Sequence, residues 1–252
     1  MSATAPLSGR HILVTGASAG IGRATATRLA AEGARLTLVA RRAERLEALA
    51  AELTEAHGGR VDVLVADVRD PDAYTALGDD TPDVLILNAG LARGTNIVQD
   101  NTPEELDEMI DTNIKGYLHL LRAFLPGMRA RASGDVVLLG SVAGRQVYPG
   151  GGVYCMTKHA VRALYESLRV DSAGFGVRFT TVDPGLVETE FSDVRLRDAE
   201  KAKAVYQGYR PLQPEDIADV IHFALTRPAH VNLGEIVVWP SDQASTTRVE
   251  KS

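Results

Sequence analysis

The sequence predicts an α/β fold in which a doubly wound, seven-stranded parallel sheet carries helices on both faces. Short runs rich in Val, Leu and Ile alternate along the chain with longer segments of helical character. The short runs are almost continuously apolar, as expected for strands that are covered on both faces. The 252 residues, 45% of them hydrophobic and 24% charged, are enough for one α/β domain spanning residues 1–252.

Seven strands are expected, at His11–Val14, Arg35–Ala40, Val61–Ala66, Asp83–Leu87, Asp135–Leu139, Val177–Val182 and Glu235–Val238. Helices are expected at Gly20–Gly33, Arg42–His57, Pro103–Ala132, Val153–Gly174 and Pro214–Thr226. Gly33 and Gly174 stand where a left-handed glycine ends a helix. Thr102-Pro103 is typical of a helix N-cap followed by proline. The connection Asp70–Leu77 is short, so we expect an element of about two turns there. The aperiodic last segment, Gln243–Ser252, predicts a mobile tail or an oligomer contact.

Composition narrows the classes of function. With 27 Lys+Arg and 33 Asp+Glu, the net charge of −6 gives no reason to expect nucleic acid. The single cysteine, Cys155, excludes an intramolecular disulfide, and the six histidines show no metal-ligand spacing. No uncharged apolar stretch of about 18 residues predicts a membrane span, and Met1–Gly9 does not resemble a signal peptide. We therefore expect a soluble cytoplasmic protein without a metal, membrane or nucleic-acid partner.

A glycine-rich turn follows the first strand, at Thr15–Gly22, with the spacing G-x-x-x-G-x-G. Such a turn lets the backbone approach a pyrophosphate, and the following helix faces the anion with free N–H groups and its positive dipole end. The alternative is a tight strand-to-helix connection without a ligand. The residues of this turn that we predict to bind a dinucleotide are Gly16, Ser18, Ala19, Gly20, Ile21 and Gly22.

Two arginines follow the second strand, where an acidic residue would favour NAD. The chain has Ala40-Arg41-Arg42 there, and two guanidinium groups can clamp a 2′-phosphate. This favours NADP(H). The alternative is that both arginines are solvated and paired with Glu44 or Glu47. Because positive charge at a helix N-terminus is unfavourable, that alternative is the weaker one.

Further candidate cofactor contacts follow the third and fourth strands, at the edge where doubly wound sheets bind ligands. Asp67, next to Val68, can accept a hydrogen bond from an adenine amino group. The small residues of Asn88-Ala89-Gly90 allow a ribose to lie close to the backbone. The alternative for both segments is ordinary loop chemistry.

A proton-transfer set is predicted on and near the fourth expected helix. Tyr154 and Lys158 are four residues apart and share one helix face. A nearby ammonium favours the phenolate, so this pair can act as a general acid and base. Ser141 follows a strand and can donate to a developing oxyanion, and the side chain of Asn113 can anchor a water chain to Lys158. Taken singly, each has a structural alternative: a snorkelling lysine, a turn serine, an exposed helix asparagine.

Together, these motifs and Pro184-Gly185 resemble the short-chain dehydrogenase/reductase family over almost the whole chain. The resemblance implies a single Rossmann-like domain, usually a homotetramer or homodimer, that transfers a hydride between a nicotinamide and a carbonyl/alcohol pair. It implies that Tyr154 is the acid/base, that Lys158 lowers its pKa and holds the ribose, and that Ser141 polarises the carbonyl while Asn113 supports a proton relay. The residues it places beside the nicotinamide are Pro184, Gly185, Val187 and Thr189. Leu87 departs from the family pattern, which has Asn there.

The segment 186–212 corresponds to the substrate lid of this family. Its amino-acid sequence, together with that of Pro228–Asn232, is similar to the NADP-dependent 3-hydroxy acid (serine-type) dehydrogenase branch of the family. A small hydroxy acid brings a carboxylate, which needs a cation. The candidate substrate residues are Arg145, Tyr148, Phe191 and Arg195. The alternatives are a broad aldehyde/ketone reductase, a 3-ketoacyl reductase and a non-catalytic NADPH sensor.

Overall fold

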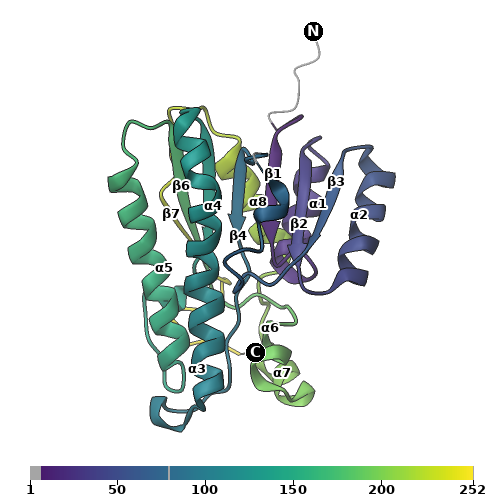
Figure 1. Cartoon of the computed structure of the whole chain (residues 1–252). Coiled ribbons are helices and arrows are strands. Elements are labelled where there is room, and N and C mark those ends of the chain that lie inside the picture. The colour runs from purple at the N-terminus through teal and green to yellow at the C-terminus, as the bar shows by residue number, and fades with distance from the viewer. Residues whose placement is uncertain (1–6, 79, 252) are drawn as a thin grey trace.

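The centre of the molecule is a parallel sheet with the strand order β3-β2-β1-β4-β5-β6-β7 (Figure 1). The computed structural model describes residues 7–78 and 80–251. The strands are β1 (His11–Thr15), β2 (Arg35–Ala40), β3 (Val61–Val65), β4 (Val84–Leu87), β5 (Gly134–Leu139), β6 (Val177–Pro184) and β7 (Glu235–Val238). The strand order reverses between β1 and β4, which creates the switch point where doubly wound sheets bind ligands. The predicted seven-stranded parallel sheet is confirmed.

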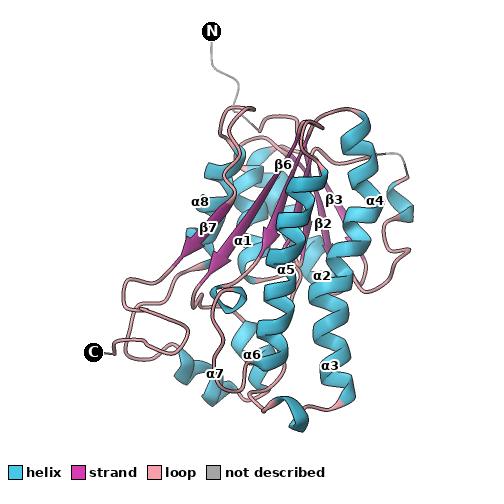
Figure 2. Ribbon diagram, turned by 90° about the vertical axis from the view of Figure 1, so that its left-hand side faces the viewer, coloured by secondary structure: helices cyan, strands magenta, loops and turns pink. Residues whose placement is uncertain are grey.

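Helices cover both faces of the sheet (Figures 1 and 2). The first face is covered by α1 (Gly20–Ala30), α2 (Ala43–His57) and α8 (Pro214–Leu225). The second is covered by α4 (Gly116–Ala130) and α5 (Gly152–Asp171), with α3 (Pro103–Ile110) leading into α4. The short helices α6 (Phe191–Leu196) and α7 (Ala199–Val205) lie beyond the carboxyl ends of the strands (Figure 1).

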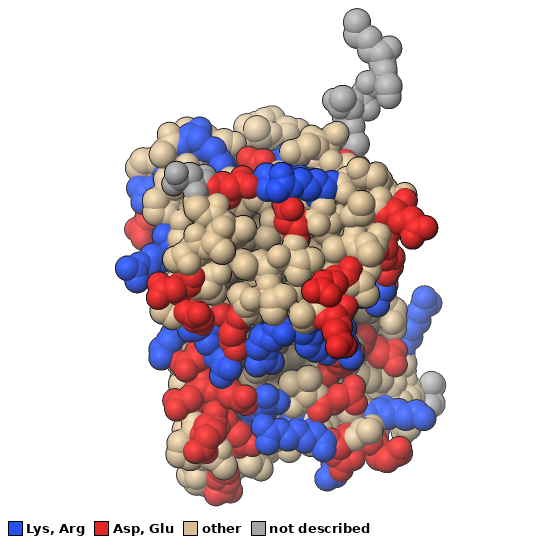
Figure 3. Space-filling view, turned by 45° about the vertical axis from the view of Figure 1, so that its right-hand side comes forward, with Lys and Arg blue, Asp and Glu red and all other residues tan. Residues whose placement is uncertain are grey.

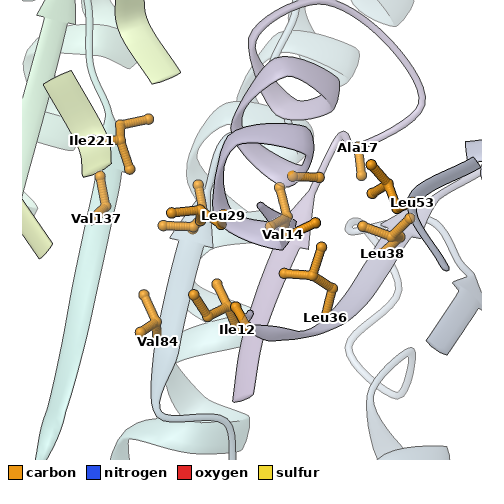
Figure 4. Packing of buried hydrophobic residues seen from close by; sticks show 14 of the residues in the cluster. Ile12, Val14, Ala17, Leu29, Leu36, Leu38, Leu53, Val84, Val137 and Ile221 are labelled. Carbon is orange, nitrogen blue, oxygen red and sulfur yellow. The ribbon is translucent and has the colours of Figure 1, made fainter. Parts of the chain in front are cut away.

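Two apolar cores follow from the alternation of side chains along each strand. On the first face, Ile12 and Val14 of β1 pack in one cluster with Leu29 of α1 (Figure 4). On the second face, Leu13 joins a cluster with Tyr117 of α4. Because both faces are buried, every residue of β1 must be shielded from water, and all five are. This explains the continuous apolar runs of the sequence.

The expected long helix Pro103–Ala132 is not uniform. A π-helical turn, Asp111–Lys115, separates α3 from α4, and such turns arise where local contacts override the regular hydrogen-bond ladder. The expected N-cap at Thr102 is confirmed, since its Oγ1 accepts from the Glu105 N–H at 3.3 Å, and the Glu105 side chain completes a capping box. Gly33 and Gly174 have the expected positive φ, at 77° and 86°.

Two expectations about connections need adjustment. The crossover after β3 contains a single 3₁₀ turn, Thr75–Leu77, rather than about two helical turns. Its neighbour Tyr74 is buried edge-on against Phe124, with ring centroids 5.7 Å apart, and this anchors the short connection. Residues 243–251, expected to form a mobile tail or an oligomer contact, are tied to the domain, because Gln243 is buried and bridges to Val249; the oligomer contact stays a prediction. Over the described part of the chain, no helix has the length and apolar character needed to span a bilayer.

Candidate active site

A cavity of about 670 Å³ lies at the carboxyl ends of the strands, beside the switch point. Its walls come from the β1–α1 turn, the ends of β2, β4, β5 and β6, the N-terminal part of α5 and the segment 186–212. The two ends of that segment are tied together, since the Glu188 N–H donates to the Leu212 carbonyl at 2.9 Å. The segment therefore closes one side of the cavity as a unit, with α6 and α7 at its tip.

Most of the predicted site residues meet in this one cavity. The lining includes Gly16, Ser18, Ala19, Gly20, Ile21, Arg41, Arg42, Asp67, Val68, Asn88, Ala89, Gly90, Ser141, Tyr148, Tyr154, Lys158, Pro184, Gly185, Val187, Thr189, Phe191 and Arg195. Three predicted residues lie outside the lining: Gly22, Asn113 and Arg145.

The glycine-rich turn has the shape that a pyrophosphate needs. Gly16 has a φ of 67°, which disfavours a side chain, and the Asn88 side-chain amide donates to the Thr15 carbonyl at 2.8 Å and holds the turn. The following helix α1 begins at Gly20 without a side-chain cap or an acidic residue in its first turn, so its N–H groups remain available to an anion. Gly22 serves packing, because a Cβ there would collide with the Gly16 carbonyl oxygen.

The two arginines after β2 lie at one end of the cavity, but their partners differ from the expected ones. Arg42 donates from Nε and Nη2 to Ser18 Oγ at 3.1 and 3.0 Å, and from Nη1 to Glu190 at 2.8 Å. Arg41 lies 3.7 Å from Asp67. The alternative pairing with Glu44 or Glu47 is therefore wrong. Ser18 and two guanidinium groups at one end of the cavity fit an anionic 2′-phosphate.

Asp67 is held in place by a neighbouring arginine. Arg69 donates to both of its carboxylate oxygens, at 3.1 and 2.7 Å. These bonds lower the pKa of Asp67, so it is an acceptor at neutral pH. This suits the predicted contact with an adenine amino group.

Tyr154 and Lys158 lie one turn apart on α5, with the Lys158 Nζ 5.9 Å from the centroid of the tyrosine ring. Burial raises the pKa of Tyr154, while the nearby Ser141 hydroxyl and the Arg195 charge lower it. Burial also lowers the pKa of Lys158 to about 8, and its ammonium donates to the Leu139 carbonyl at 2.8 Å. The pKa of Tyr154 is therefore raised overall, because burial outweighs any lowering of that pKa by Lys158.

The side chain of Asn113 does not line the cavity, and the water chain from it to Lys158 stays a prediction. It is fully buried. Its amide donates to the Leu91 carbonyl at 2.8 Å and to Thr157 Oγ1 at 3.0 Å, and its Oδ1 accepts from the Leu91 N–H at 2.9 Å. Both amide hydrogens are therefore used within the protein. Asn113 braces the loop after β4 against α5 and shapes the site indirectly.

Arg145 does not serve as a substrate cation, which corrects an expectation. Its Nε donates to the buried Asp183 at 2.7 Å, and its Nη2 lies 3.2 Å from Glu235. A buried carboxylate such as Asp183 needs this counter-charge, so the guanidinium is already committed.

Arg195, in contrast, points its charge at the cavity. It donates to the Gly94 carbonyl at 2.9 Å and to the Tyr148 hydroxyl at 3.0 Å, and its Nη2 has only the Gly150 carbonyl at 3.5 Å. Within residues 7–78 and 80–251, no Asp or Glu lies at ion-pair distance from it. Phe191 lies beside Tyr154, and the centroids of the two rings are 5.5 Å apart. A cation, a hydroxyl and an aromatic ring thus surround the tyrosine.

Sequence reasoning missed several polar residues of the cavity wall, among them Glu190, Gln243 and Thr246. Gln243 Oε1 accepts from the Leu186 N–H at 2.9 Å and so joins the tail to the segment 186–212. No local pattern marks either tail residue, because this contact spans 57 residues of chain. Across the described residues, no cluster of three or more His, Cys, Asp or Glu is arranged to hold a metal ion.

Comparison with known proteins agrees with this geometry. The sequence model of the family described as short chain dehydrogenase matches residues 10–200. The chain belongs to this family. Membership of this family accounts for the cavity that the glycine-rich turn shares with the pair Tyr154 and Lys158.

Three relatives are informative. The chain is 43% identical over 251 residues to an NADP-dependent 3-hydroxy acid dehydrogenase of Schizosaccharomyces pombe, covering 96% of this chain and 97% of the relative. It is 43% identical over 241 residues to sulfoacetaldehyde reductase 2 of Chromohalobacter salexigens, covering 92% and 95%. The closed form of serine dehydrogenase complexed with NADP+ superposes with a TM-score of 0.88 at 38% identity, covering 96% of this chain and 100% of that structure.

Proposed function

We propose that this short-chain dehydrogenase is an NADP(H)-dependent oxidoreductase that interconverts small 3-hydroxy acids and their carbonyl forms. One observation carries the proposal: the acid/base Tyr154 shares its cavity with the cation Arg195, which has no carboxylate partner among the described residues. The resemblance to enzymes described as acting on a 3-hydroxy acid and on serine supports the same substrate class.

The cofactor assignment rests on the residues after β2. The guanidinium groups of Arg41 and Arg42, with the Ser18 hydroxyl, offer donors for the 2′-phosphate of NADP(H). The glycine-rich turn offers its backbone N–H groups to the pyrophosphate. The relative and the structural neighbour named with NADP support this assignment. When bound, NADP(H) supplies or accepts the hydride.

The chain's own residues handle the proton and the developing charge. Tyr154 exchanges a proton between its Oη and the substrate oxygen, taking it during oxidation and giving it during reduction. Ser141 donates a hydrogen bond to the same oxygen as charge develops there. Lys158, with a pKa of about 8, carries positive charge at neutral pH, and this charge opposes the burial that disfavours the phenolate required for oxidation. In this proposal its ammonium also holds a ribose hydroxyl of the bound cofactor.

Arg195 positions the substrate through its carboxylate. A hydroxy acid whose oxygen lies at Tyr154 presents a carboxylate a few ångströms away, and a planar guanidinium binds such a group with two parallel hydrogen bonds. Tyr148 holds the guanidinium in place through its hydroxyl, 3.0 Å from Nη1. Phe191 excludes water from the space beside the phenol. Closure of the segment 186–212 as a lid completes this enclosure.

The assembly and location are also part of the proposal. We propose a homotetramer or homodimer, because α4 and α5 carry exposed apolar side chains, among them Leu118 and Val170, which are 44% and 77% exposed. We propose the cytoplasm as the location, because a chain whose single cysteine is Cys155 forms no intramolecular disulfide and so needs no oxidising compartment.

An NADP+-coupled activity screen tests the function. Serine, allo-threonine, 3-hydroxypropionate and 3-hydroxyisobutyrate are compared with neutral alcohols of equal size by following NADPH formation. We expect kcat/KM for at least one acid to exceed that of its neutral counterpart by about tenfold or more. Equal rates on acids and neutral alcohols would identify a broad aldehyde/ketone reductase. NADPH binding without turnover on any compound would identify a sensor and refute the proposal.

A further inference from the structure

Glu190 joins the segment 186–212 to the end of the cavity that holds the arginines. Its Oε2 accepts from Arg42 Nη1 at 2.8 Å, and its Oε1 accepts from Arg45 Nη1 at 2.7 Å. Glu190 is also the N-cap residue of α6. One carboxylate thus connects α2, beside the predicted 2′-phosphate site, to the first residue of a lid helix.

This carboxylate uses the same charge that a 2′-phosphate needs. Arg42, Ser18 and Glu190 all line the cavity, and Arg42 holds Ser18 with one edge of its guanidinium and Glu190 with the other. The two arginines lower the pKa of Glu190, so it is anionic at neutral pH. A phosphate bound to Arg42 therefore either displaces Glu190 or lies beside its negative charge. Figure 3 shows basic and acidic side chains interleaved across the middle of one face of the molecule.

We propose that Glu190 is an internal competitor of the 2′-phosphate and thereby sets how strongly the enzyme prefers NADP(H) to NAD(H). The inference rests on the cofactor and is independent of the substrate. In the free enzyme Glu190 neutralises Arg42, and the bound 2′-phosphate takes its place on that guanidinium. A cofactor without the 2′-phosphate leaves the ion pair intact.

Arg45 and Arg41 have different parts in this exchange. Arg42 is the N-cap residue of α2, and Arg45 follows three residues later in the first turn of the helix. Arg45 can therefore keep its bond to Glu190 when Arg42 changes partner. Arg41 is 59% exposed, and its one printed charged contact among residues 7–78 and 80–251 is with Asp67 at 3.7 Å, whose own oxygens are held by Arg69. Arg41 is therefore the freer guanidinium, and the competition acts through Arg42.

Isothermal titration of Glu190→Gln and the wild type with NADP+, NAD+, 2′,5′-ADP and 5′-AMP tests the proposal. The substitution removes the carboxylate and keeps the size of the side chain. We expect NADP+ and 2′,5′-ADP to bind about two- to tenfold more tightly to the variant, because an exposed ion pair no longer has to be broken and a like charge is gone. The affinities for NAD+ and 5′-AMP are expected to change less than twofold.

Two controls make the result specific. Glu52→Gln removes a comparably exposed carboxylate that pairs with Arg23 at 2.8 Å, and it should leave all four affinities unchanged. In an Arg42→Ala background, the gain from Glu190→Gln should shrink, since no ion pair between these two side chains has to be broken there. Unchanged NADP+ affinity in the single variant, an equal gain for NAD+, or weaker 2′,5′-ADP binding would each overturn the proposal. Failure of the hydroxy-acid screen would leave these binding results unaffected.

Discussion

Replacement of Arg195 by alanine separates recognition of the substrate carboxylate from the chemistry at Tyr154. Arg195 lies in the cavity wall with no Asp or Glu at ion-pair distance among the described residues, and its Nη2 has only a 3.5 Å contact with the Gly150 carbonyl. That edge of the guanidinium is available to a carboxylate. A hydrogen bond to a charged group contributes about 1.5–3 kcal/mol.

At about 2–3 kcal/mol, loss of this contact predicts a fall in kcat/KM for a 3-hydroxy acid of about 30- to 150-fold. Most of the fall should be in KM, because the carboxylate is bound both before and during hydride transfer. Arg195→Lys keeps the charge but not the planar fork, so we expect an intermediate loss of about tenfold.

Initial rates of NADPH formation, with a 3-hydroxy acid and a neutral alcohol of the same size, provide the assay. Arg195 also holds the Gly94 carbonyl at 2.9 Å, so its removal can loosen the cavity wall. Such loosening would reduce turnover of both substrates alike. If Arg195→Ala lowers kcat/KM for acid and alcohol by the same factor, the carboxylate assignment is refuted.

Two further predictions concern stability. Burial depresses the pKa of Lys158 from 10.5 to about 8, so between these values the unfolded chain binds more protons and Lys158 contributes more stability as the pH rises. Urea unfolding is measured for the wild type and Lys158→Met at pH 7.5 and pH 10. From the lower to the higher pH, the free energy of unfolding of the wild type should rise by about 1–3 kcal/mol relative to that of the variant. No relative rise would contradict the depressed pKa. Arg145→Ala should destabilise the fold by about 3–5 kcal/mol, because Asp183 is left buried without its counter-charge. This should appear in the unfolding midpoint, whereas the ratio of acid to alcohol kcat/KM should stay constant, and a selective loss with the acid would restore Arg145 as a substrate residue.

The sheet was predictable because burial on both faces leaves a direct trace in the sequence. Strands such as Arg35–Ala40 are apolar after their first residue except for Thr37, and the structure buries Leu36 to Ala40 completely or nearly so. The turn Thr15–Gly22 was predictable for a similar reason, since only small residues allow its backbone contacts. Local requirements of this kind appear as local patterns.

Features that depend on distant partners were not predictable. The π-helical turn at Asn113 accompanies hydrogen bonds to Leu91, 22 residues earlier in the chain. Arg145 stands close to Ser141 in sequence, but its charge is taken by Asp183, 38 residues later. Glu190 reaches Arg42 across 148 residues. Identity of the side chain indicates what each group can do, whereas only the fold decides which partner it finds.

The role of Tyr154 as proton donor and acceptor is tested most directly by Tyr154→Phe, which removes one hydroxyl and keeps the ring beside Phe191. Turnover of a 3-hydroxy acid with NADP+ is measured together with NADPH binding by titration. We expect kcat to fall by at least about 100-fold, the usual contribution of a general acid or base, with cofactor affinity changed less than threefold. A variant that binds NADPH normally and turns over within tenfold of the wild type would contradict the assignment of the whole site.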